Sequence, residues 1–236
     1  MRNNNINKFI SSFFYTFLVI FIVKSFFYES FKIRSSSMFP TLIDGDFIIV
    51  EKFCYGIKDP IFNINILNYK QPKHGDIIIF RYPRNKKIFF VKRIAAIPGD
   101  IIKYNSINNK IFIYRKYLNK NKKHITKILF YKIIKNNINE KKYIKHVFEN
   151  LCFNKKILLY KKFSKNKKNF MYILCVPKNN YFVLGDNLKN SLDSRFWGFV
   201  PEKNVIGKVR MIWMNITNTK KNYFCNIMFN RIGTTF

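Results

Sequence analysis

An apolar run near the N-terminus limits most strongly what this chain can fold into. Residues 9–28 read FISSFFYTFLVIFIVKSFFY and carry one charge, Lys24. At a rise of roughly 1.5 Å per residue, a helix of this length reaches about 30 Å, the thickness of the hydrocarbon core of a bilayer. No Ala-x-Ala-like cleavage site follows, and the run is longer than the apolar region of a cleaved signal peptide. We therefore predict a retained transmembrane anchor over residues 9–28, after a short tail over residues 1–8.

Beyond the anchor, the pattern changes to short apolar runs that end in turn signals. Gly-Asp pairs stand at residues 45–46, 75–76, 99–100 and 185–186, each at the edge of such a run. Runs of four to six β-branched and aromatic residues between Gly, Asp and Pro are typical of strands. No helical pattern after residue 40 is as long as the anchor. The fold class is therefore predicted to be mainly β, with one N-terminal transmembrane helix.

The middle of the chain is unusually basic. Residues 101–170 contain 20 Lys and Arg against two acidic residues, in a chain whose net charge is +32. Such a charge would suit nucleic acid or an anionic membrane surface. The chain is also rich in Lys, Asn, Ile, Phe and Tyr, whose codons are AT-rich, and this favours nucleotide bias as the cause. We expect no nucleic-acid partner. Residues 103–170 are predicted to be an inserted subdomain, β-rich or partly disordered, between two parts of one main domain, residues 29–102 and 171–236.

Histidine-based and metal-based chemistry are both poorly supported by the sequence. The three histidines are scattered, with His124 and His146 in the basic stretch and His74 beside a turn, so all three are interpreted as surface residues. Neither they nor the four widely spaced cysteines show the spacing of a metal site, and the cysteines do not require a disulfide. No cofactor is expected.

A serine can instead be activated by an unprotonated lysine, provided that the amine is desolvated in an apolar place. Lys92 fits this requirement because FFV precedes it and Arg93-IAAI follows. Strand alternation would direct Lys92 and Arg93 to opposite faces. The single SxxK match, residues 164–167, lies in a polar Lys-rich stretch and is interpreted as chance.

Four short segments together resemble the bacterial type I signal peptidases, membrane-anchored Ser-Lys proteases that remove signal peptides. The first reads SSSMFPTL at residues 35–42, followed by Gly45-Asp46. The others are GDIIIF at residues 75–80, Lys92-Arg93 with PGD at residues 98–100, and GDNLKNSLDSRFWG at residues 185–198. They occur in the family's order behind an anchor, and the resemblance covers almost the whole chain except its basic middle.

The resemblance implies a role for eight residues. Ser37 would be the nucleophile and Lys92 the general base, while the Ser37 N–H and the Ser35 hydroxyl would form the oxyanion hole. Ser191 would hold the lysine amine. The remaining four would be a structural ion pair, Asp193 with Arg195, and two residues of the substrate pocket, Ile33 and Val91.

The resemblance also implies a function and a location. The protein would be a serine endopeptidase that cleaves exported precursors after small residues, with its β-rich signal-peptidase-like catalytic domain on the outer face of the inner or plasma membrane. Signal-peptide-bearing precursors and membrane lipid would be its partners. Two alternatives stay open: a Ser-Lys peptidase with another membrane-protein substrate, and a membrane-tethered basic binding protein without catalysis.

Some positions depart from the family pattern. Ser36 replaces a glycine, Arg34 replaces a frequent proline, and Leu188 replaces an arginine that would add a charged contact. Many members also have two N-terminal spans, whereas one is predicted for this chain. None of these changes involves Ser37 or Lys92, so activity is expected.

Overall fold

The computed structural model describes residues 2–22, 24, 27–58, 65–68, 70–105, 110–118, 124–132, 158–163, 170–218 and 225–236. Much of the predicted basic insert and His146 lie outside these residues. The chain forms two compact units, each assembled from separate stretches. The first contains Met1–Lys32, Asp46–Gln71 and Gly207–Phe236, and the second contains Ile33–Gly45 and Pro72–Ile206.

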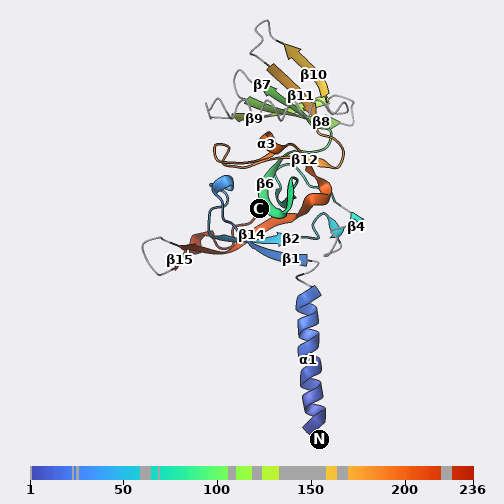
Figure 1. The fold of residues 1–236 in the computed structure, drawn as a ribbon, viewed down its shortest axis with the longest axis vertical. Coiled ribbons are helices and arrows are strands. Elements are labelled where there is room, and N and C mark those ends of the chain that lie inside the picture. Colours follow the sequence, from blue (N-terminus) through green and yellow to red (C-terminus); the bar gives the residue numbers. More distant parts are fainter. Residues whose placement is uncertain are drawn as a thin grey trace. The chain divides into compact units, whose positions relative to one another are not determined.

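The first unit contains a helix and an antiparallel sheet (Figure 1). Helix α1 spans Arg2–Ile22, and the sheet runs in the order β1-β2-β14, with β15 paired on β14. The strands are β1 (Tyr28–Lys32), β2 (Asp46–Glu51), β14 (Val205–Asn218) and β15 (Cys225–Ile227). A hairpin of β3 (Gly56–Lys58) and β4 (Asn65–Asn68) and the short helix η4 (Phe229–Arg231) complete this unit.

Helix α1 covers most of the predicted anchor. The anchor was predicted to end at Tyr28, where the structure begins strand β1. Within the part of the chain that the structure describes, no helix meets both the length and the apolarity that a membrane crossing requires.

The second unit carries the serine and lysine segments on an antiparallel sheet in the order β5-β6-β12-β13. These strands are β5 (Ile77–Tyr82), β6 (Asn85–Ala96), β12 (Asn180–Leu184) and β13 (Val200–Pro201). Three short helices lie between strands: η2 (Ser36–Met38), α3 (Ser194–Trp197) and η3 (Glu202–Asn204). The exposure along β6 falls from its start to its end, so its final residues enter the core.

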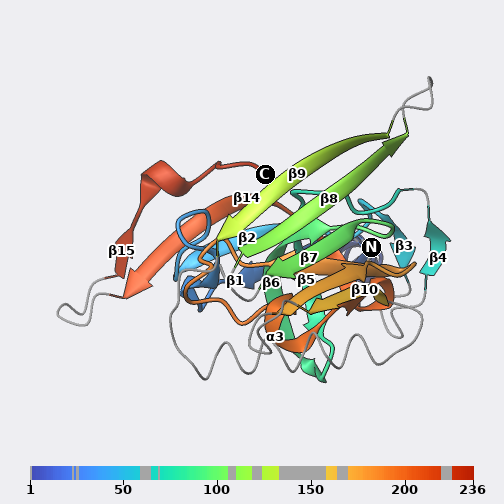
Figure 2. The same cartoon turned by 90° about the horizontal axis from the view of Figure 1, so that it is seen from above.

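A five-stranded sheet in the same unit has the order β10-β11-β7-β8-β9. Its strands are β7 (Ile101–Asn105), β8 (Lys110–Leu118), β9 (His124–Lys132), β10 (Leu158–Phe163) and β11 (Phe170–Cys175), and Figure 2 shows β8 and β9 as a long hairpin. Apolar side chains from β6, β7, β8, β11 and β12 share one core, which contains Ala95, Ala96, Ile102, Ile111, Ile113, Leu174, Val176, Phe182 and Leu184. The prediction of a mainly β chain is confirmed.

Candidate active site

The short helix η2 presents Ser37 from a tight turn. Ser35 is its N-cap, and the Ser35 Oγ accepts a hydrogen bond of 3.1 Å from the Ser37 N–H. A serine suits this position because its side chain can satisfy a backbone donor that the first turn leaves unpaired. Ser37 is 7% exposed and Met38 is 1% exposed. The reactive hydroxyl is therefore held in a nearly buried place.

Strand β6 brings Lys92 to this hydroxyl. Lys92 pairs in register with Ile78 of β5, and its side chain is buried. The distance from Lys92 Nζ to Ser37 Oγ is 2.5 Å, a hydrogen bond between residues that are 55 positions apart in the chain. Because strand side chains alternate, the next residue, Arg93, is directed away from the serine.

Burial changes the protonation of Lys92. Desolvation lowers the pKa of its amine from 10.5 to about 8, and the charge of Arg195 lowers it as well. The carboxylates of Asp193 and Asp186 act in the opposite direction and raise this pKa. Desolvation is the largest cause because a buried ammonium loses its hydration. Near neutral pH, part of the population therefore holds a neutral amine beside the serine hydroxyl.

The loop after β12 packs tightly against the nucleophile. A Cβ on Gly185 would lie 2.1 Å from Ser191 Oγ and 2.5 Å from the carbonyl oxygen of Ser37, so only glycine fits there. Two residues further on, the Asn187 N–H donates to the same Ser37 oxygen at 3.1 Å. The loop and the nucleophile turn are thus joined by direct contact.

Ser191 lies in this loop but does not make the contact that the resemblance implied. Its side chain is buried, and its Oγ has no hydrogen-bond partner among the described residues. The expected hydrogen bond from Ser191 to the Lys92 amine is therefore not formed in this structure. The physical reason is local packing, since the Oγ stands over Gly185 instead.

Asp193 and Arg195 form a fully buried ion pair. Arg195 Nε donates to Asp193 Oδ1 at 2.7 Å, and Arg195 Nη2 donates to Oδ2 at 2.9 Å. The same Asp193 carboxylate accepts from the Arg195 and Gly185 backbone N–H groups and caps helix α3. Arg195 Nη2 also reaches the carbonyl oxygens of Leu188 and Ser191. This pair holds the loop from the inside, and its two charges act on the Lys92 amine.

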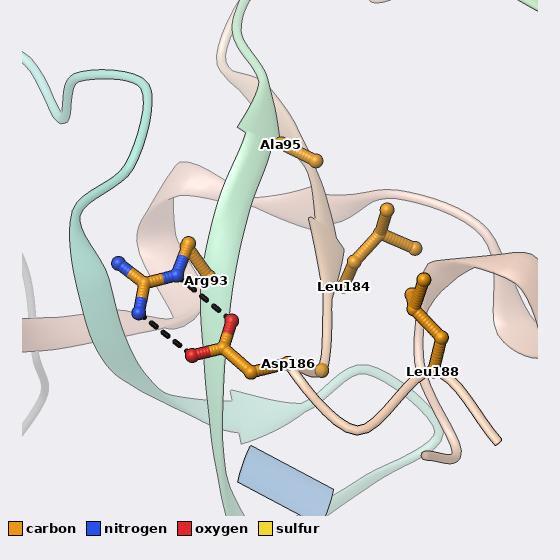
Figure 3. Close-up of a pocket in the computed structure, with 6 residues that line it drawn as sticks. Arg93, Ala95, Leu184, Asp186 and Leu188 are labelled. Atoms are coloured by element: carbon orange, nitrogen blue, oxygen red, sulfur yellow. Dashed lines mark hydrogen bonds and ion pairs between the residues drawn. The ribbon is translucent and has the colours of Figure 1, made fainter. Parts of the chain in front are cut away.

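A second ion pair near the site was missed by sequence reasoning. Arg93 donates to both oxygens of Asp186, at 2.8 and 2.7 Å, as Figure 3 shows. Thr41, from the segment after the nucleophile, donates to Asp186 Oδ2 at 2.5 Å. A cavity of about 340 Å³ lies beside this pair and is lined by Arg93, Ala95, Leu184, Gly185, Asp186 and Leu188. Leu188, one of the departures from the family pattern, contributes an apolar wall where an arginine was expected.

The remaining predicted residues lie beside the dyad in the chain. Ile33 is 6% exposed, and its carbonyl oxygen accepts from the Gly45 N–H, which closes the loop that carries Ser37. Val91 is half-buried and pairs with Ile79. The Ser35 hydroxyl, predicted to be an oxyanion donor, faces the Ser37 N–H and accepts from it.

His74 was interpreted as a surface residue, and this interpretation was wrong. Its Nε2 is hydrogen-bonded to Asp100 Oδ2, and only 15% of its side chain is exposed. Asp100 also accepts from the Ile97 N–H and is buried. The pair joins the turn before β5 to the turn before β7. The His74 ring is thus bound to Asp100, whereas the Lys92 amine is the basic group that contacts the Ser37 hydroxyl.

Comparisons with known proteins show the family of this chain. The model of the family "Signal peptidase, peptidase S26" matches residues 6–214. Signal peptidase I of Buchnera aphidicola subsp. Baizongia pistaciae is 40% identical over 96% of this chain and 82% of that protein. Signal peptidase I of Pseudomonas fluorescens is 31% identical over 94% of this chain and 76% of that protein. A crystal structure of a signal peptidase I from Enterococcus faecalis is 27% identical, covers 60% of this chain and 98% of its own, and has a TM-score of 0.31. The chain therefore belongs to the signal peptidase family, peptidase S26.

Proposed function

We propose that Ser37 and Lys92 form the catalytic dyad with which this signal peptidase cleaves signal peptides from exported precursors. Members of the family are serine endopeptidases, and the curated relatives are named as signal peptidase I. The alternative of a binding protein without catalysis is not favoured. The observation that carries the proposal is the 2.5 Å contact between a buried lysine amine and a buried serine hydroxyl.

The chemistry follows from the lowered pKa of Lys92. A neutral amine accepts the proton of Ser37 while Oγ attacks the carbonyl carbon of the scissile peptide bond. The resulting ammonium then protonates the leaving amine, and an ester links the signal peptide to Ser37. In the second half, the neutral Lys92 accepts a proton from water while the water oxygen attacks the ester carbon. The bond between Ser37 Oγ and this carbon then breaks, the Lys92 ammonium returns the proton to Oγ, and the signal peptide leaves with a free carboxyl group.

The negative oxygen of the tetrahedral intermediate needs hydrogen-bond donors. The Ser37 N–H and the Ser35 hydroxyl are the proposed pair, and each such donor is worth about 2.7–4 kcal/mol in the transition state. In the structure, the Ser35 Oγ accepts from the Ser37 N–H. Substrate binding must therefore turn the Ser35 hydroxyl outward, so that both groups donate to the substrate oxygen.

Selectivity for small residues before the cleaved bond is assigned to the surroundings of the dyad. Ile33 and Val91 are proposed to line shallow apolar pockets, where their branched side chains would exclude large groups. An extended precursor could add as a strand beside these residues, because backbone hydrogen bonds then hold it regardless of its sequence.

The N-terminal segment is proposed to be a single-pass membrane anchor, with the catalytic unit on the outer face of the inner or plasma membrane. Its apolar side chains on α1 are exposed, among them Phe13, Phe17 and Phe21. Apolar surface of this kind is costly in water. Resistance of the protein to alkaline extraction from membranes, with protease digestion of the catalytic unit from the outer side only, would support this topology.

Cleavage of a purified precursor with an Ala-x-Ala site tests the proposed dyad. We expect the protein to release the signal peptide, and Ser37→Ala and Lys92→Ala to lose this activity while they remain folded. Lys86→Ala is a matched control, since Lys86 lies on the same strand β6 and is exposed. Cleavage by Ser37→Ala at the wild-type rate would show that another residue is the nucleophile.

A further inference from the structure

Asn187 hydrogen-bonds both backbone carbonyls that flank the nucleophile. Its side-chain Nδ2 donates to the Ser36 carbonyl oxygen at 3.0 Å, and its backbone N–H donates to the Ser37 carbonyl oxygen at 3.1 Å. The two partners lie 151 and 150 positions away in the chain. One residue of the loop after β12 therefore holds the turn at two consecutive peptide groups.

The side-chain contact is important because of the geometry of a peptide group. The Ser36 carbonyl and the Ser37 N–H belong to the same planar unit and point in opposite directions. A donor that fixes the direction of the Ser36 oxygen therefore also fixes the direction of the Ser37 N–H. That N–H is the proposed oxyanion donor.

The same contact also strengthens the donor. A hydrogen bond accepted by a peptide carbonyl polarises the group and makes its N–H a better donor. The Ser36 oxygen accepts a second hydrogen bond of 3.1 Å from the Phe39 N–H, within the turn itself. The hydrogen bond from the Asn187 amide comes from outside the turn, so it connects the Ser36–Ser37 peptide group to the loop after β12.

The loop that carries Asn187 is itself held in place. The Asn190 N–H donates to the Asn187 carbonyl at 3.0 Å. The preceding residue, Asp186, accepts hydrogen bonds at Oδ2 from both Arg93 and Thr41. These contacts hold the backbone of the loop on both sides of Asn187.

We propose that Asn187 is a positioning residue for the oxyanion hole: its side-chain amide holds and polarises the Ser36–Ser37 peptide so that the Ser37 N–H faces the developing negative charge. This inference rests on the proposed dyad and adds a residue that acts through the Ser37 backbone. It predicts a loss in the chemical step without a loss of substrate binding, since Asn187 is assigned no contact with the precursor.

The test compares Asn187→Ala with Asn190→Ala in the full-length protein, using precursor cleavage at several pH values. Asn190 is an exposed residue of the same type in the same loop. For Asn187→Ala we expect kcat to fall about tenfold, less than the loss reported for removing an oxyanion donor outright. KM should stay within about twofold, and the pH at which kcat/KM is half-maximal should stay at the wild-type value, because the surroundings of Lys92 are unchanged. Asn190→Ala should match the wild type.

Asn187→Leu is the second variant, because leucine keeps most of the volume but has no donor. It should show the same loss of kcat, which separates the missing hydrogen bond from a missing side chain. The proposal is overturned by wild-type kcat in either folded variant, by a rise in KM alone, or by a shifted pH profile, which would assign the effect to Lys92. A wild-type protein that does not cleave the precursor would instead contradict the proposed function itself.

Discussion

The position that a Cβ of Gly185 would occupy lies 2.1 Å from Ser191 Oγ and 2.5 Å from the backbone oxygen of Ser37. Ser191 could move its hydroxyl, but the backbone of the nucleophile turn cannot yield without displacing Ser37. Gly185→Ala should therefore lower kcat/KM by about a hundredfold or more, since a displacement of about 1 Å at a reacting group has effects of this size. Precursor cleavage by the folded variant measures this loss.

Gly75→Ala provides the contrast for this prediction. Gly75 has φ of +86°, and nothing lies within 4 Å of a Cβ built on it. The substitution should strain the turn and lower the free energy of unfolding by about 1–2 kcal/mol, while kcat changes little. Equal activities of the two alanine variants would show that the close contact at Gly185 is unimportant for catalysis.

The protonation of Lys92 should be visible in the pH dependence of cleavage. Burial lowers the pKa of its amine to about 8, and the base acts only when neutral, so kcat/KM should rise with pH and reach half its maximum near pH 8. The charge of Asp186 raises this pKa, so Asp186→Asn should move the midpoint to lower pH. Measurements from about pH 6 to 10 test both statements, and a flat profile would exclude a lysine base.

The same lowered pKa predicts that Lys92 destabilises the folded protein near neutral pH. Between the folded value of about 8 and the ordinary value of 10.5, the unfolded chain binds more protons at Lys92 than the folded protein, so stability rises with pH across this window. Below about pH 8, the buried amine lowers the free energy of unfolding by its full amount, about 3 kcal/mol. Lys92→Met should therefore unfold at a higher temperature than the wild type at pH 7, with a smaller difference at pH 10.

Thermal unfolding at these two pH values checks the sign of this effect. A stabilisation that is equal at both would mean that the methionine packs better for reasons unrelated to charge. A variant less stable than the wild type at pH 7 would contradict the prediction outright.

The buried ion pair should matter for folding more than for chemistry. Asp193 is 0% exposed and Arg195 is 1% exposed, so Asp193→Asn leaves a buried guanidinium without its counter-charge. The expected loss is about 3–5 kcal/mol in the free energy of unfolding, measured by urea denaturation. The surface pair Lys52–Glu29, at 2.8 Å with side chains 22% and 44% exposed, is the control. Glu29→Gln should cost less than about 1 kcal/mol, and similar losses for the two variants would refute this distinction.

Local sequence patterns were sufficient to predict the fold class of this chain and the strand that carries Lys92. The strand character of the segment around Lys92 and the mainly β class follow from short-range patterns of apolar residues, Gly, Asp and Pro, whereas Ser37 was assigned from the family resemblance. Resemblance then identified the Asp193–Arg195 pair, whose members are two positions apart and form the ion pair observed here. In each case the relevant signal lay within a few residues.

Contacts between distant segments were not accessible in this way. Arg93 and Asp186 are 93 positions apart, and His74 and Asp100 are 26 apart, so their pairing depends on strand register and on how the turns pack. The sequence did not indicate the proposed role of Asn187. Its amide donates to the backbone carbonyl of Ser36, and any residue at that position would supply this carbonyl. The unpaired Ser191 hydroxyl likewise reflects packing over Gly185, which no local pattern reveals.

The lowered pKa of the buried Lys92 amine has a consequence for substrate binding. With a pKa of about 8, about one molecule in ten holds neutral Lys92 at pH 7. A precursor bound over the proposed dyad would exclude water from the amine, and further desolvation would lower its pKa again. The enzyme with bound precursor should therefore contain a larger fraction of neutral Lys92 than the free enzyme. A signal peptide that fits well would in this way promote its own cleavage.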